Sequence, residues 1–187
     1  MDSLERIAAD AAGGDPLAAA ALVRATQSDV WRLCAALGDA GTADDLTQET
    51  YLRAFGSLHR FEGRSSLRTW LLSIARRVCA DAVRSRRRRR VTLVREDAEL
   101  ERLATDGLAD RTAEGVVVAD LLGRLDPDRR EAFVLTQLLG LPYAEAAEVA
   151  GCPVGTIRSR VARARADLID SLAGVKEDGG ESDAAHA

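Results

Sequence analysis

Apolar residues recur every three or four positions along most of the chain, which is the period of an amphipathic helix. The pattern predicts helices over residues 16–37, from 42 or 44 to 58, from 66 to at least 84, and over 127–139, 142–150 and 153–172. Glycines stand where several of these stretches end, and Ser65 or Ser66 and the pair Asp126–Pro127 are residues with which helices commonly begin. The chain is therefore expected to be helical, with its first helix beginning at Pro16.

The predicted helices fall into two groups, over residues 1–95 and 116–175. Residues 96–115 between them are acidic and lack a continuous apolar face. Alanine and leucine dominate the composition and runs of β-branched residues are short, which favours helix over strand. We expect an all-α fold of two small helical domains joined by a flexible acidic linker, with a disordered polar tail over residues 176–187.

Composition and residue spacing exclude several classes of protein. No apolar run reaches the length of about 18 residues that crosses a membrane. The mixed, acidic N-terminus lacks the features of a signal peptide, so a cytoplasmic protein is expected. Cys34, Cys79 and Cys152 have no metal-ligand spacing, and each is expected to be a small buried residue. His59 and His186 belong to no recognisable catalytic motif, and the sequence has no phosphate-binding glycine loop. We therefore expect no enzymatic activity, no bound metal and no cofactor.

The net charge of −4 conceals two blocks of opposite sign. Residues 60–95 hold twelve arginines against two acids, whereas residues 96–114 hold seven acids against two arginines. A basic block of this density is typical of proteins that bind nucleic acid. A solvated surface helix and linker is the alternative, and composition alone leaves both open.

A candidate DNA-binding element lies near the C-terminus, in GCPVGTIRSRVARAR (residues 151–165). A short helix, a turn with glycine and this second helix have the order of a helix-turn-helix. At 100° per residue, an apolar stripe faces inward, and the outward or flanking face carries Thr156, Arg158, Ser159, Arg160, Ala162 and Arg163. Arginine donates hydrogen bonds to guanine or phosphate, and no acid lies between residues 152 and 166, so we expect this helix to bind duplex DNA. Arg165 is expected to contact phosphate or another part of its own domain.

The stretch DDLTQETYLRAF (residues 44–55) indicates a second surface. The same geometry places Tyr51, Ala54, Phe55 and Leu58 on an inner side. Leu46 lies away from them, beside the polar residues Glu49, Thr50 and Arg53. An exposed leucine in such a patch favours a protein-binding surface, while a solvated helix start is an equally good interpretation on physics alone.

The stretch FEGRSSLRTWLLSIARRVCADAVRSRRRRR (residues 61–90) combines aromatic rings with arginines. Trp70, Ser73, Arg77 and Arg84 are expected along one edge of its helix, and Arg76 projects from the back. Bases stack on rings while guanidinium groups hold the backbone, so this combination suits single-stranded nucleic acid. Core packing is the alternative for Trp70, because it borders the apolar stripe.

In this order the three stretches resemble the extracytoplasmic-function (ECF) class of bacterial sigma factors. DDLTQETYLRAF is similar to that family's segment for binding core RNA polymerase, and FEGRSSLRTWLLSIARRVCAD to its segment for reading the minus-ten element. Residues 125–168 are similar to its domain for the minus-thirty-five element, and the resemblance covers about residues 18–90 and 118–170. It implies an alternative sigma factor, without catalytic chemistry of its own, that directs core polymerase to promoters and helps melt the minus-ten element.

The resemblance also implies roles for single residues. Those that would bind the polymerase are Asp45, Leu46, Gln48 and Glu49. Those that would contact the melted minus-ten strand are Phe61, Arg64, Trp70, Ser73, Arg76, Arg77 and Arg84. Those that would contact the upstream duplex are Thr156, Arg158, Ser159, Arg160 and Arg163. An anti-sigma factor is common in the family, and the sequence leaves open whether one binds this chain.

The alternative hypothesis is a stand-alone helix-turn-helix regulator that binds duplex DNA without polymerase. That hypothesis accounts for residues 116–175 but assigns no role to the pattern over residues 44–84. Many relatives have asparagine where this chain has Arg77, so the resemblance does not imply which minus-ten sequence is preferred.

Overall fold

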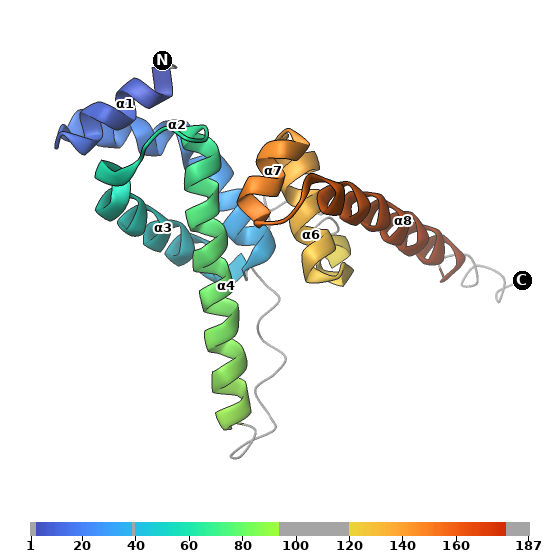
Figure 1. The fold of residues 1–187 in the computed structure, drawn as a ribbon. Helices are drawn as coiled ribbons and strands as arrows, with labels where there is room; N and C mark the ends of the chain where they lie inside the picture. The colour runs from blue at the N-terminus through green and yellow to red at the C-terminus, as the bar shows by residue number, and fades with distance from the viewer. Residues whose placement is uncertain (1–2, 39, 94–119, 179–187) are drawn as a thin grey trace, which may run out of the picture.

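The computed structural model describes residues 3–38, 40–93 and 120–178, and within these ranges the protein is helical and contains no strand. The elements in chain order are α1 (Ser3–Ala12), α2 (Pro16–Leu37), η1 (Ala40–Thr42), α3 (Ala43–Ser57), η2 (Leu58–Arg60), α4 (Leu67–Leu93), α6 (Pro127–Phe133), η3 (Val134–Leu138), α7 (Tyr143–Ala150) and α8 (Val154–Asp178), as Figure 1 shows. The all-α prediction is confirmed, and α2, α3 and α7 begin and end within two residues of their predicted bounds. The predicted acidic linker, residues 96–115, lies outside the described residues.

Helix α1 lies before the first helix that the sequence predicts. It reverses into α2 through a tight turn in which Gly14 has φ of 93°, a conformation that glycine adopts without steric cost. The Asp15 side chain then accepts a hydrogen bond of 2.8 Å from the backbone N–H of Leu17 and caps α2. The sequence did not indicate α1, because its apolar stripe is short and two of its four members, Ala8 and Ala11, are alanines.

The N-terminal half is built on α2, α3 and α4, which bury their apolar faces against one another. Leu33 of α2 and Leu72 of α4 are fully enclosed, and the Thr26 and Tyr51 hydroxyls form a buried hydrogen bond of 2.7 Å between α2 and α3. Cys34 and Cys79 are also buried, as expected, whereas Cys152 of the C-terminal half is only partly buried. The hydrogen bond with Cys34, together with burial, raises the pKa of the Cys79 thiol, so this thiol stays protonated and packs as an apolar group.

The C-terminal half begins with a helical segment over residues 120–124, followed by a capped helix. The Asp126 carboxylate accepts a hydrogen bond of 3.0 Å from the N–H of Asp128, with Pro127 in the first turn, as predicted. Gly140, with φ of 66°, ends the π-helical η3 that continues α6, so the predicted stop is confirmed as well. Helix α8 runs to Asp178, beyond the predicted end at residue 172 and into the segment predicted to be a disordered tail.

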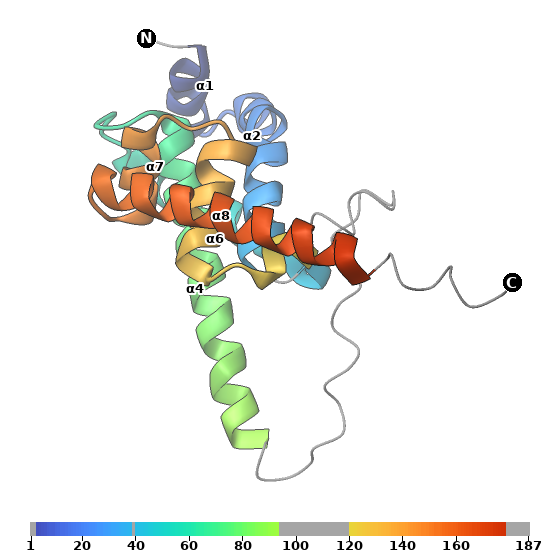
Figure 2. The same ribbon diagram turned by 90° about the vertical axis from the view of Figure 1, so that its right-hand side faces the viewer.

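The two halves pack directly on each other. One apolar cluster contains Leu71 and Val78 of α4 together with Leu135 and Val149 of the C-terminal half. Helices α6 and α7 lie against α2 and the first half of α4, whereas the later turns of α4 and the end of α8 project from this body, as Figures 1 and 2 show. No described helix combines the length and apolar character that a membrane span requires.

Gly38 allows α2 and α3 to approach closely at the end of α2. A Cβ at this position would lie 2.5 Å from Leu46 Cδ1 and 2.6 Å from the Cys34 carbonyl oxygen. We expect Gly38→Ala to lower the free energy of unfolding by about 1–3 kcal/mol, which is typical of overpacking. Thermal unfolding followed by circular dichroism measures this change.

Gly56→Ala is the matched control, because a Cβ at residue 56 of α3 meets nothing within 4 Å. Alanine favours helix over glycine by about 0.5–1 kcal/mol, so this variant should be as stable as the parent or more stable. Equal melting temperatures for Gly38→Ala and the parent would contradict the close approach.

Candidate nucleic-acid and polymerase interfaces

Helices α7 and α8 form the predicted helix-turn-helix. Gly151 ends α7 with φ of 66°, and the N–H of Cys152 returns to the Ala147 carbonyl at 3.1 Å, so the turn is short and well defined. Ile157 and Val161 of α8 are buried beneath α7 and α6, which places the opposite side of the first turns of α8 at the surface. The predicted inward stripe is therefore confirmed.

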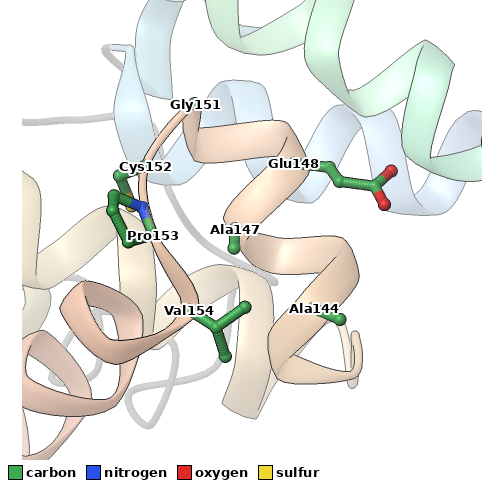
Figure 3. A pocket seen from close by; sticks show the side chains of 7 residues that line it. All are labelled: Ala144, Ala147, Glu148, Gly151, Cys152, Pro153 and Val154. Atoms are coloured by element: carbon green, nitrogen blue, oxygen red, sulfur yellow. The ribbon is translucent and has the colours of Figure 1, made fainter.

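An open-sided hollow of about 500 Å³ lies at this turn. Its lining comes from the two helices and the turn, namely Ala144, Ala147, Glu148, Gly151, Cys152, Pro153 and Val154, as Figure 3 shows. The lining is mostly small and apolar, and the Glu148 carboxylate points away from Cys152 in Figure 3. The hollow therefore provides room beside the turn and no catalytic constellation.

The outward face of α8 carries two arginines that have no partner among the described residues. Arg158 and Arg163 are exposed, and neither forms a hydrogen bond or ion pair with another of the described residues. Ser159 is exposed between them and donates to the Thr156 carbonyl at 2.9 Å, while Thr156 is half-buried. The two guanidinium groups are thus free to donate to an external acceptor.

Arg160 and Arg165 are engaged within the C-terminal half. Arg160 forms an ion pair with Asp128 of α6 and lies 3.8 Å from the Cys152 sulfur, so it does not belong to the free outward face. Arg165 donates to the Gln137 side chain at 2.7 Å, which is an intradomain contact of the kind expected for it. The sequence places Arg160 at the flank of the outward face, and the pairing with Asp128 follows from the packing of α6 beside α8.

The segment between η2 and α4 carries an aromatic pair. The rings of Phe61 and Trp70 lie with centroids 5.3 Å apart and are tilted by 55°. Ser66 caps α4 by accepting a hydrogen bond of 3.1 Å from the N–H of Thr69, as predicted. Both rings are partly exposed. Trp70 therefore packs against the core with one part of its ring and leaves another part accessible at the surface.

The remaining polar residues of this candidate strand-binding surface differ in how they are held. Arg77 is exposed and has no partner among the described residues. Arg64 pairs with Glu62 at 3.1 Å on the open surface, and Ser73 donates to the Thr69 carbonyl at 2.9 Å. Arg84 pairs with Asp81, whose carboxyl pKa is lowered mainly by the hydrogen bond from Arg53.

Arg76 lies in the seam between the two halves. Its guanidinium forms two hydrogen bonds with the carboxylate of Glu131 in α6, one of them 3.3 Å long. Arg68 extends the seam, because it donates to Asp29 at 2.7 Å and to the Leu139 carbonyl at 2.6 Å. Arg76 was predicted to project from the back of α4, where DNA could reach it, and in this arrangement it faces an acid of the same chain instead.

Leu46 is buried, and the expectation that it is exposed was wrong. Only 7 % of its surface is accessible, and it packs in the main core beside Gly38. Thr47 and Thr50 are buried on the same side of α3, and the Thr50 hydroxyl is satisfied by the Leu46 carbonyl at 2.7 Å. The inner side of α3 is therefore centred on these residues, and Phe55, expected inside, is 36 % exposed.

The exposed side of α3 carries both the predicted polar residues and an apolar one. Asp45 and Gln48 are exposed, Glu49 is half-buried, and Leu52 beside them is 71 % exposed. Arg53 holds Glu49 at 2.7 Å and Asp81 of α4 at 2.8 Å, which steadies this side of the helix. Sequence reasoning missed Leu52, although its spacing of four from Gln48 and seven from Asp45 places it on their stripe.

These features define a helical DNA-binding protein with a separate acidic surface and an aromatic, basic surface. Sigma-70 region 2 matches residues 22–89, and Sigma-70, region 4 matches residues 116–168. The ECF RNA polymerase sigma factor SigC of Mycobacterium tuberculosis is 54 % identical over 172 residues, which cover 90 % of each chain. ECF sigma factor EcfG of Rhodopseudomonas palustris is 40 % identical over 134 residues, covering 70 % of this chain and 71 % of that protein.

Solved structures show the same fold. CnrH, in complex with the cytosolic domain of CnrY, has a TM-score of 0.70 and 30 % identity over 92 % of this chain and 99 % of that chain. The sigma factor RpoE of Bartonella quintana, in complex with the anti-sigma factor NepR, has a TM-score of 0.67 and 30 % identity over 80 % and 93 %.

The chain belongs to the ECF class of the sigma-70 family. It is an alternative sigma factor, a protein that binds core RNA polymerase and promoter DNA and directs the polymerase to promoters, and it is not an enzyme.

The seam between the halves should depend on Glu131, which is buried against Arg76. We expect Glu131→Ala to weaken the packing of the halves by about 1–3 kcal/mol, because Arg76 loses its charged acceptor. Small-angle X-ray scattering of the full chain should show a larger radius of gyration. Asp128→Ala is the control, because it removes another carboxylate of α6, one whose partner, Arg160, lies in the same half. An equal radius of gyration for the two variants would show that the ion pair does not hold the seam.

Proposed function

We propose that three separate surfaces of this sigma factor carry its function, and we assign each to named residues. The exposed stripe of α3 binds core RNA polymerase, the aromatic and basic surface of residues 61–84 binds the melted minus-ten strand, and the first turns of α8 read the minus-thirty-five duplex. The observation that carries the proposal is that Arg158 and Arg163 project from an exposed helix-turn-helix without any partner among the described residues. The proposed functional units are residues 1–95 and 116–175, with the acidic segment 96–115 as their linker.

The polymerase-binding surface consists of Asp45, Gln48, Glu49 and Leu52. A solvent-facing leucine surrounded by carboxylates and an amide can bury apolar area while the polar groups meet cations on the partner. Leu46 is 7 % exposed, whereas Leu52 is 71 % exposed. We therefore assign the apolar contact with polymerase to Leu52, and Leu46 holds α3 in place.

The minus-ten surface combines Phe61 and Trp70 with Ser73 and the exposed Arg77. Flipping a base out of the stack costs a few kcal/mol, and stacking on an aromatic ring with hydrogen bonds to the base offsets that cost. Arg64 and Arg84 lie at the surface with only exposed ion pairs, which exchange readily for phosphate. Arg76 joins this surface only when it leaves Glu131.

The minus-thirty-five surface follows from the position of α8. The N-terminal part of a recognition helix contacts base edges in the major groove, and Ser159 and Gly155 there are small enough for close approach. Arg158 and Arg163 are the proposed base or phosphate contacts. Thr156 and Arg160 support them, Arg160 through its ion pair with α6.

Two further properties belong to the proposal. We place the protein in the cytoplasm, because RNA polymerase works there. We also propose a protein partner of the anti-sigma type, because the Bartonella relative was solved with one and shares the fold over 80 % of this chain. Co-purification from the native cell tests this partner, and recovery of the sigma factor without a stoichiometric companion before induction would contradict it.

Reconstituted transcription tests the whole proposal. The purified protein is mixed with core polymerase and promoter DNA, and transcripts with a defined start are measured. We expect specific initiation only when the protein is present. Unchanged transcription, together with duplex binding that needs no polymerase, would favour a stand-alone regulator.

Leu52→Glu should weaken binding to core polymerase by about 2 kcal/mol or more, in the range of an interface hot spot, while leaving the melting temperature unchanged. Affinity capture of core polymerase measures the loss. Leu17→Glu is the control, because Leu17 is also highly exposed but lies on α2. Leu46→Glu should instead unfold the protein, since it places a carboxylate in the core. Normal polymerase binding by Leu52→Glu would refute the assignment of this surface.

Arg163→Ala should reduce affinity for the cognate minus-thirty-five duplex by about 1–3 kcal/mol if the guanidinium contacts a base. Competition between cognate and scrambled duplexes measures the loss. An equal loss on all sequences would indicate a phosphate contact. Arg165→Ala is the control, because Arg165 lies on the same helix as Arg163 but is bound to Gln137 of η3. This variant should keep the preference for the cognate sequence.

A further inference from the structure

We infer that α1 is a positioning element for minus-ten strand binding, because it holds the aromatic pair and the loop that precedes α4. This inference rests on the proposed function of the Phe61–Trp70 surface. It concerns a segment that the match to Sigma-70 region 2 does not reach, since that match begins at residue 22.

The apolar stripe of α1 packs directly into the cluster that contains the aromatic pair. Ala8 is 2 % exposed and lies with Leu22 of α2, Leu58 of η2 and Leu67 of α4, all of them buried. The half-buried residues around this centre include Leu4, Ile7 and Ala11 of α1 together with Phe61 and Trp70. Helix α1 thus joins the two ends of the 61–66 loop, at Leu58 and Leu67, into one apolar unit.

Phe61 depends on this second cluster more than Trp70 does. Trp70 also packs against the main core of the protein, whereas Phe61 packs only in the cluster with α1 among the apolar clusters of the described residues. The Phe61 N–H donates to the Leu58 carbonyl at 3.0 Å and Gly63 turns with φ of 67°, so the backbone fixes the path of the loop, but neither feature holds the Phe61 ring. The ring of Phe61 is therefore held largely by apolar contacts.

Backbone hydrogen bonds fix the C-terminal end of α1 against the start of α2. At its end, the N–H groups of Gly13 and Gly14 return to the Ala9 and Ala11 carbonyls at 3.0 Å each, and that of Asp15 returns to Asp10 at 3.2 Å. The reversal into α2 is thus closed by hydrogen bonds on consecutive residues. A docked helix of this kind fixes the ring that a base would stack on before the DNA arrives, which reduces the ordering cost of binding.

Ile7→Ala in the full chain, bound to core polymerase, tests the inference. The probe is a fluorescent single-stranded oligonucleotide with the non-template minus-ten sequence of a promoter that the protein transcribes. We expect its Kd to rise roughly tenfold, within the range for one stacked base. Affinities for core polymerase and for the minus-thirty-five duplex should stay within about twofold of the parent, and Ile7→Leu should restore most of the oligonucleotide binding.

A stability control separates positioning from general loosening. Val30→Ala removes buried methyl groups from the main core of the same half, away from the second cluster. If Val30→Ala lowers the melting temperature as much as Ile7→Ala but leaves oligonucleotide binding unchanged, the inference is supported. Equal losses of binding by the two variants, or parent-like binding by Ile7→Ala, would overturn it.

Two further measurements complete the test. Should Ile7→Ala fail to fold, Leu4→Ala takes its place, at a half-buried residue in the first turn of α1. The expected result is the same: weaker binding of the oligonucleotide and parent-like binding of the duplex. Trp70→Ala tests the proposed function separately. If that variant, or the parent itself, shows no specific binding of the oligonucleotide, the minus-ten assignment fails and this inference with it; if Trp70→Ala loses binding while the α1 variants do not, only the inference fails.

Discussion

The ion pair between Arg76 and Glu131 determines how the two halves of the protein meet. Glu131 is 6 % exposed, and a buried carboxylate is tolerated only beside a cation with good hydrogen-bond geometry. The hydrogen bonds to Glu131 also raise the pKa of the Arg76 guanidinium, so this guanidinium stays charged. Because one partner lies on α4 and the other on α6, burial of Glu131 sets the position of the C-terminal helices along α4. Arg68, two turns earlier on the same face, is then in reach of the Leu139 carbonyl.

Helix α4 consequently has three sides with different environments. One side, with Leu72 and Val78, is buried in the core, a second side forms the seam, and a third carries exposed arginines such as Arg77. Adjacent residues on a helix point 100° apart, so Arg76 and Arg77 share their chemistry but not their surroundings. While the seam is formed, the guanidinium of Arg76 donates to Glu131 and not to phosphate, whereas that of Arg77 remains available. The assignment of a DNA contact to an arginine thus depends on its partners within the chain.

The sequence predicted most helix bounds because capping residues and glycines mark them locally. Asp126 with Pro127 and the left-handed Gly151 act through their immediate neighbours, so no tertiary knowledge is needed to place them. The inner side of α3 could not be predicted in the same way. Thr50 was counted as polar, but its hydroxyl is satisfied by a carbonyl of its own helix, so it can be fully buried and the core extends around to Leu46. The packing of the halves was equally invisible, since it depends on contacts between residues more than 50 positions apart.

The absence of acids from residue 152 to 166 indicated that the arginines of α8 face DNA. In the structure Arg158 and Arg163 are exposed for this role, whereas Arg160 and Arg165 are bound within the chain. Acids and amides missing from the run itself are supplied by other elements, because Asp128 pairs with Arg160 and Gln137 accepts from Arg165. A helix without acids is therefore not necessarily a helix with free arginines. What distinguishes Arg158 and Arg163 is that no acceptor of the described chain reaches them, and each keeps its full set of donors for an outside partner. Recognition by α8 accordingly depends on which of its guanidinium groups the fold leaves unpaired, more than on how many it contains.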